Sequence, residues 1–206
     1  MTEETKAMEH LRVIRTLMER ATVYRAISSP TALAGGLVAV FVSSWSLFLA
    51  QPLPFVESWL AALVIALLAN TYFIWRDHSR EGRPLLSSGL RLAIRAVLPS
   101  VLAAAVFSFP FIREGQDYPF LAIIWVIFYG FALLATEQFA PRSLIWLGRA
   151  FLIAGLVGFI GIHTHLSPVL FDEPSGANWI MGGTFGLFHL IYAAATWRRS
   201  LDQTAE

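Results

Sequence analysis

The sequence predicts an all-α, polytopic membrane protein with six transmembrane helices arranged as three hairpins, preceded by an amphipathic N-terminal helix. Three observations lead to this fold class. Of the 206 residues, 56% are hydrophobic and only 14% are charged, whereas soluble domains carry about 25% charged residues. The apolar residues gather in six runs, each long enough to cross a bilayer. If the six runs cross the membrane in turn, almost all lysine and arginine residues fall on the same side of it.

The six apolar runs form one predicted membrane domain, residues 30–199, between a cytoplasmic segment 1–29 and a cytoplasmic tail 200–206. Proline and glycine separate the runs, as expected for loops. Pro99 is the exception, because it lies inside the third run and predicts a kink. The predicted spans are 31–50, 58–75, 91–112, 118–136, 143–162 and 178–197.

The distribution of positive charge predicts the orientation. With the N-terminus in the cytoplasm, fourteen of the fifteen lysine and arginine residues are cytoplasmic, and only Arg113 lies outside. Positive residues in short loops stay on the cytoplasmic side. The outer loops carry acidic residues instead, among them Glu57, Asp117 and Asp172. We therefore expect a multi-pass protein of the cytoplasmic membrane with both termini inside.

Residues 5–27 predict the amphipathic helix. Its apolar positions follow helical spacing: Met8, Leu11, Ile14, Met18 and Ala21. Three interpretations remain open. The segment lies on the inner leaflet with its arginines near lipid phosphates, packs on a partner protein or a second copy, or covers the cytoplasmic ends of its own helices. The expected partners are thus membrane lipids and a cytoplasmic protein or a second copy, and the net charge of +1 gives no reason for direct nucleic-acid binding.

Two short motifs carry a resemblance to a known group. The first is Ile14-Arg15-Thr16-Leu17-Met18-Glu19-Arg20, and the second is Gly182-Gly183-Thr184-Phe185-Gly186-Leu187-Phe188-His189-Leu190 followed by Tyr192. In these motifs and in its layout, the chain resembles small bacterial six-helix membrane proteins of unknown function. The resemblance implies a bacterial inner membrane and a regulatory partner, because members of that group often sit beside a small winged-helix regulator. It supplies no catalytic residue.

The last predicted span contains the main candidate for function, His189, because ionisable groups inside a span are costly. His189 shares one helix face with Gly182 and Gly186, and small residues on one face allow another helix to approach closely. Gly155 and Gly158 form a matching stripe on the fifth span. We therefore expect the last two helices to pack along these stripes, with His189 facing protein.

Three roles fit His189 at this stage. A neutral imidazole that joins helices through hydrogen bonds is the first, and a proton-binding or ligand-binding group is the second. The third is a haem ligand, which is disfavoured because no second histidine lies in the middle of a span.

Other polar residues gather in the cytoplasmic half of the predicted domain. Arg95 and Arg149 enter the apolar runs by about one turn, either to reach the inner headgroups or to form an anion site. Glu137 is the natural partner of Arg142 or Arg149, while Asn70 and Tyr129 lie at a similar depth. The outer half is predicted to contain few polar residues, with serines only near its edge, so any cavity is expected to open inward.

The sequence lacks the motifs of the common membrane enzymes and pumps. It contains no His-Glu-x-x-His, no glycine-rich phosphate loop and no Gly-x-Ser-x-Gly. The outer-loop residues His163, His165, Asp172 and Glu173 do not have a diagnostic metal spacing. We predict no catalytic residue, no metal and no cofactor.

Three functions are compatible with these observations. The first is a non-enzymatic regulatory or scaffold protein that engages a cytoplasmic partner. The second is a small-solute transporter or solute-binding subunit with an inward-facing cavity lined by His189, Asn70 and Arg149. The third is a lipid-modifying enzyme of the inner leaflet with His189 or Glu137 as base. The sequence favours the first, because it carries no recognisable chemistry.

Overall fold

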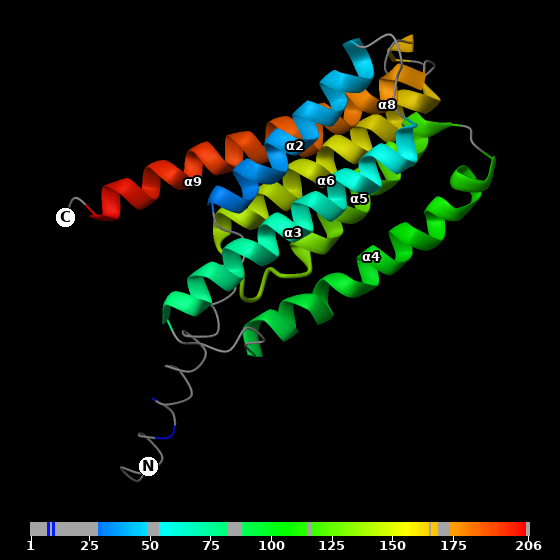
Figure 1. The fold of residues 1–206 in the computed structure, drawn as a ribbon. Helices are drawn as coiled ribbons and strands as arrows, with labels where there is room; N and C mark the ends of the chain where they lie inside the picture. The colour runs from blue at the N-terminus through cyan, green and yellow to red at the C-terminus, as the bar shows by residue number, and fades with distance from the viewer. Residues whose placement is uncertain are drawn as a thin grey trace.

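The computed structural model describes six helical segments and no strand among residues 29–48, 54–81, 88–114, 117–164 and 174–204, with positions 8, 10 and 166–168 besides (Figure 1). The first five segments are α2 (Ser29–Phe48), α3 (Phe55–Glu81), α4 (Ser88–Glu114), α5 (Tyr118–Leu134) and α6 (Arg142–His163). The sixth segment is continuous but changes its hydrogen bonding, from α8 (Pro174–Met181) through η1 (Gly182–Phe188) to α9 (His189–Thr204). Of the expected helix 5–27, only Met8 and His10 belong to the described residues, so that prediction lies outside them.

Four helices are long and apolar enough to cross a membrane, which supports a membrane protein. They are α2, α3, α4 and α6. The apolar helix α5 is shorter, at 17 residues. It extends for about 26 Å at 1.5 Å per residue, which is close to the 30 Å hydrocarbon core of a bilayer.

Local chemistry explains where α5 begins and ends. Asp117 precedes it with a positive φ of 55°, and its carboxylate accepts a hydrogen bond from the Phe120 N–H at 3.3 Å. This is the cap that a helix start requires, and Pro119 fits in the first turn because a missing N–H costs nothing there. At the other end the chain leaves the helix in a turn, where the Thr136 hydroxyl donates to the Leu133 carbonyl at 2.6 Å.

Glycines bring α5 and α6 into close contact. A Cβ built on Gly130 would lie 2.8 Å from the Leu152 backbone nitrogen, which leaves no room for a side chain. Across the interface, a Cβ on Gly155 would overlap the Ile127 side chain. A Cβ on Gly158 would lie 3.1 Å from Ile123. The glycine stripe of the fifth predicted span therefore faces α5, and small residues allow two helices to approach closely.

The glycines of the sixth segment face α2. A Cβ on Gly186 would lie 2.8 Å from Val40, and a Cβ on Gly182 would overlap Ser43. From the opposite side, a Cβ on Gly36 of α2 would lie 3.2 Å from the Gly186 carbonyl oxygen. The expectation that the two glycine stripes pack against each other is therefore wrong. Each stripe packs on a different helix, and α2 and α9 lie side by side (Figure 1).

The helix α4 stands apart from the rest of the bundle along much of its length (Figure 1). Only 6% of its apolar stretch is buried, against 33% for α2 and for α6. Its main neighbour is α5, which it meets where the Trp125 Nε1–H donates to the Ser108 hydroxyl at 2.7 Å. It runs as one helix through Pro99 and Pro110. Most of its apolar surface is therefore left for lipid.

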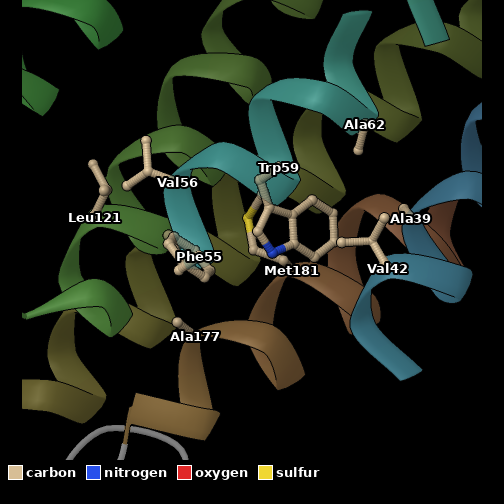
Figure 2. Close-up of a cluster of buried hydrophobic side chains, with 10 residues drawn as sticks. Ala39, Val42, Phe55, Val56, Trp59, Ala62, Leu121, Ala177 and Met181 are labelled. Atoms are coloured by element: carbon tan, nitrogen blue, oxygen red, sulfur yellow. The ribbon is translucent and has the colours of Figure 1, made fainter. Parts of the chain in front are cut away.

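One of the two hydrophobic clusters lies where the start of α3 meets α2, α5 and α8. Figure 2 shows the Trp59 indole reaching from α3 towards Ala39 and Val42 of α2, with Met181 beside it. Phe55 stacks on Trp125 of α5 with ring centroids 5.7 Å apart. These large side chains hold α3 at one end, while its second half exposes apolar residues such as Leu67 and Leu68.

Candidate functional site

The segment η1 is a π-helix of seven residues in the middle of the sixth helical segment. In a π-helix each backbone N–H bonds to the carbonyl five residues back, so its turn is wider than that of an α-helix. Such turns are rare and occur frequently at functional sites. The Thr184 hydroxyl donates to the Ile180 carbonyl at 2.7 Å, one turn back. The segment ends at Phe188, and the next residue, His189, has its Nδ1 2.9 Å from the Phe185 carbonyl oxygen.

His189 is bonded at both ring nitrogens. A carbonyl oxygen only accepts hydrogen bonds, so Nδ1 carries a proton and donates to Phe185. The other nitrogen, Nε2, lies 2.8 Å from the Tyr129 hydroxyl of α5. In the neutral imidazole this nitrogen is an acceptor, so Tyr129 donates to it. This pair of residues, the Tyr129–His189 pair, joins α5 to the start of α9.

Aromatic rings from two segments, α6 and η1, pack around the Tyr129–His189 pair. The Phe151 ring of α6 lies 4.7 Å from the Tyr129 ring and 5.5 Å from the His189 ring, measured between centroids. The Phe185 ring of η1 lies 4.9 Å from the Tyr129 ring. Phe151 is fully buried and also contacts Phe188 edge-on. His189 is thus packed against rings, in geometries that stabilise aromatic clusters.

Two of the predicted site residues form a second pair, which is separate and exposed. Arg149 and Glu137 are 3.9 Å apart, and their side chains are 50% and 62% exposed. The Arg149 guanidinium also lies over the Trp146 ring at 5.2 Å. An exposed ion pair of this kind contributes little to stability.

Asn70 and Arg95 do not join either pair. Asn70 is half-buried on α3, and Arg95 is exposed on α4. Within the described part of the chain, neither makes a hydrogen bond or an ion pair with another site residue. The six predicted site residues therefore do not form one site. They divide into the Tyr129–His189 pair, the Arg149–Glu137 pair and the separate side chains of Asn70 and Arg95.

The half of the bundle where α2 ends and α3 begins holds a buried polar network that the sequence analysis missed. The Trp59 Nε1–H donates to the Asn178 side-chain oxygen at 2.9 Å, and the Ser43 hydroxyl donates to the Asn178 backbone oxygen at 2.8 Å. Ser46 is also buried, and its hydroxyl has no hydrogen-bond partner among the described residues. The prediction that this half contains few polar groups is wrong. The sequence feature that could have predicted this network is Asn178, because it places a side-chain amide at the start of an apolar run.

A cleft with a free volume of about 360 Å³ lies between α5, α6 and the α8–η1 segment. Its lining is apolar apart from Thr184, whose hydroxyl already donates to Ile180. The lining residues are Ile123, Val126, Ala154, Gly155, Val157, Gly158, Trp179, Ile180, Gly183, Thr184 and Phe188. None of the residues expected around an inward-facing cavity lines it, so that expectation is not met at this cleft.

Metal ligands do not gather within the described residues, where no group of three or more His, Cys, Asp or Glu side chains forms. His163 is exposed at the end of α6, and its Nδ1 donates to the Phe159 carbonyl at 2.9 Å. The other residues of the outer-loop set, His165, Asp172 and Glu173, lie outside the described residues.

A comparison with known protein families, with curated proteins and with solved structures finds no match to this chain. Function is therefore inferred from the geometry.

Proposed function

We propose that this chain is a non-enzymatic regulatory or scaffold protein of the bacterial inner membrane, which engages a cytoplasmic partner. The observation that carries the proposal is the Tyr129–His189 pair. Both ring nitrogens of His189 are already hydrogen-bonded within the protein, so no free polar atom remains there for a substrate. A base or a proton carrier needs access to the group on which it acts.

The contacts of the other polar residues favour this proposal over a transporter or an enzyme. A transport site needs polar groups that converge on a cavity. Asn70, Arg149 and His189 instead lie in separate surroundings, and the cleft beside η1 offers only apolar surface and one satisfied hydroxyl. Glu137 is exposed and paired with Arg149, and no acidic or basic side chain lines the cleft among the described residues.

The surface that we propose for partner binding is the cytoplasmic end of α3 and α4, together with residues 5–27. Arg91 and Arg95 are exposed on α4, and three further arginines, Arg76, Arg80 and Arg83, precede them in the sequence. The same end of α4 carries the exposed apolar residues Leu92 and Ile94. A surface that combines arginines with apolar side chains suits a protein partner.

The proposed topology has six spans as three hairpins, with both termini in the cytoplasm. Six helical segments and the one-sided arginines support it. Because the chain has no cysteine, single introduced cysteines can test it. With a membrane-impermeant maleimide on intact cells, we expect labelling of Leu166→Cys, and of Gln138→Cys only after permeabilisation. Both positions are exposed. Equal labelling of the two in intact cells would rule out this topology.

Partner binding is tested by affinity capture of the tagged protein after cross-linking in cells. We expect a cytoplasmic protein to be recovered with the full chain and lost with a variant lacking residues 1–25 or with Arg91→Gln/Arg95→Gln. Arg113→Gln is the matched control, because Arg113 is the single arginine on the predicted outer side. Recovery of no cytoplasmic protein, combined with no phenotype from the deletion, would overturn the proposed function.

A further inference from the structure

The segment η1 has two different sides. On the α2 side it is tightly packed, because Gly182 and Gly186 leave no room for a Cβ. On the α6 side it borders the cleft, where Gly183, Thr184 and Phe188 form part of the lining. A Cβ on Gly183 would have no atom within 4 Å. The π-helical turn is thus held from one side and has free space on the other.

Two hydrogen bonds between helices set the register of the helix after η1. The first is the bond of the Tyr129–His189 pair, at 2.8 Å. The second joins the Ser29 hydroxyl of α2 to the Thr196 hydroxyl, also at 2.8 Å. His189 and Thr196 are seven residues apart, which is two helical turns, so both bonds depend on the same rotation of α9.

A π-helical turn contains one more residue than the α-helical turn that replaces it. If η1 relaxes to an α-helix while α8 stays in place, every later residue moves along the helix axis into the place that the following residue occupied. That change turns α9 by about 100° and shifts it by about 1.5 Å towards its C-terminus. Phe188 then takes the place of His189 opposite Tyr129, and Ala195 takes the place of Thr196 opposite Ser29. Both inter-helix hydrogen bonds are lost.

We propose that η1 is a register switch, in which α9 has a second position one residue onward and the Tyr129–His189 bond holds it in the first. The cleft supplies the free volume for the change of shape. Glycine at positions 182, 183 and 186 permits either backbone, because it lacks the Cβ that restricts other residues. The conversion of η1 from a π-helix to an α-helix beside the cleft in this way rotates and shifts α9 along its whole length. The proposal does not depend on the identity of a cytoplasmic partner.

The absence of cysteine allows the two registers to be read by disulfide formation in membranes. The pair Ser29→Cys/Thr196→Cys reports the first register, and Ser29→Cys/Ala195→Cys reports the second. We expect Tyr129→Phe to raise the ratio of the second disulfide to the first by up to about tenfold, since one buried hydrogen bond is worth up to about 1.4 kcal/mol. Tyr129→Phe keeps the aromatic ring, so the packing around it is preserved.

Deletion of Gly183 is the matched control, because it removes the additional residue while leaving His189 and Thr196 in the first register. In that background we expect Tyr129→Phe to leave the ratio unchanged. An unchanged ratio in the full-length chain would overturn the switch. A ratio that still rises after the deletion would also overturn it, since the helix would then turn as a rigid body. If the deletion variant does not accumulate, the full-length comparison alone decides.

Discussion

Replacement of Gly130 by alanine is expected to destabilise the protein by about 1–3 kcal/mol, the usual effect of overpacking a well-filled interior. The new Cβ would lie 2.8 Å from the backbone nitrogen of Leu152 and 3.1 Å from the carbonyl oxygen of Gly148. Backbone atoms cannot rotate away as a side chain does, so α5 and α6 must separate. Unfolding in mixed micelles, followed by circular dichroism, measures the change in the free energy of unfolding.

Gly183→Ala is the control for this prediction. Both positions lie in helical segments, but a Cβ on Gly183 meets no atom within 4 Å. We expect Gly183→Ala to leave the free energy of unfolding unchanged or to increase it slightly, because alanine is the better helix former. Equal stabilities for Gly130→Ala and Gly183→Ala would contradict the close α5–α6 packing.

Phe151→Ala is expected to have the largest effect of any single truncation, a loss of about 3–5 kcal/mol. Phe151 is fully buried and contacts the rings of Tyr129, Phe185, Phe188 and His189. Removing it opens a cavity where α5, α6 and η1 meet, and the surrounding rings lose their dispersion contacts. The same unfolding experiment provides the measurement.

Phe109→Ala is the matched control for this truncation. Phe109 is 63% exposed on α4, so it contacts lipid in the bilayer. Lipid tails fill the space of a removed side chain, which is why truncation there is expected to cost little. If Phe109→Ala and Phe151→Ala destabilised the protein equally, Phe151 would not be the centre of the aromatic cluster.

The helical segments were predictable from hydropathy, but their ends were not. The second predicted span, 58–75, lies within α3, which continues to Glu81. Hydropathy marks the part of a helix that sits in hydrocarbon, whereas the helix itself ends where backbone hydrogen bonding ends. The last span, predicted as 178–197, likewise belongs to a helical segment that runs from Pro174 to Thr204.

The helix partners of the glycine stripes could not be predicted from the sequence. Spacing shows that Gly182 and Gly186 share a face, and the structure bears this out in their common contact with α2. Spacing does not say which of the neighbouring helices fills that face. Proximity along the chain suggested the preceding helix, yet α2, far away in the sequence, supplies Val40 and Ser43.

The candidate site was predictable in part. An imidazole inside a span was expected to find a hydroxyl or a carbonyl, because an unpaired polar group there is costly. The identity of its partners, Tyr129 and Phe185, depends on how α5 meets the sixth helical segment. The π-helix has no residue signature of its own, since it differs from an α-helix only in the carbonyl that each N–H reaches. Asn178 was overlooked because the serines near it suggested only the edge of the membrane.

The most direct test of a structural role for His189 is a double-mutant cycle with Tyr129→Phe, His189→Leu and the combined variant. If the Tyr129–His189 pair joins α5 to α9, the two substitutions couple in the free energy of unfolding by about 0.6 kcal/mol, the average for hydrogen bonds between membrane helices, and by at most about 1.7 kcal/mol. Additive effects, with no coupling between the two substitutions, would contradict the account.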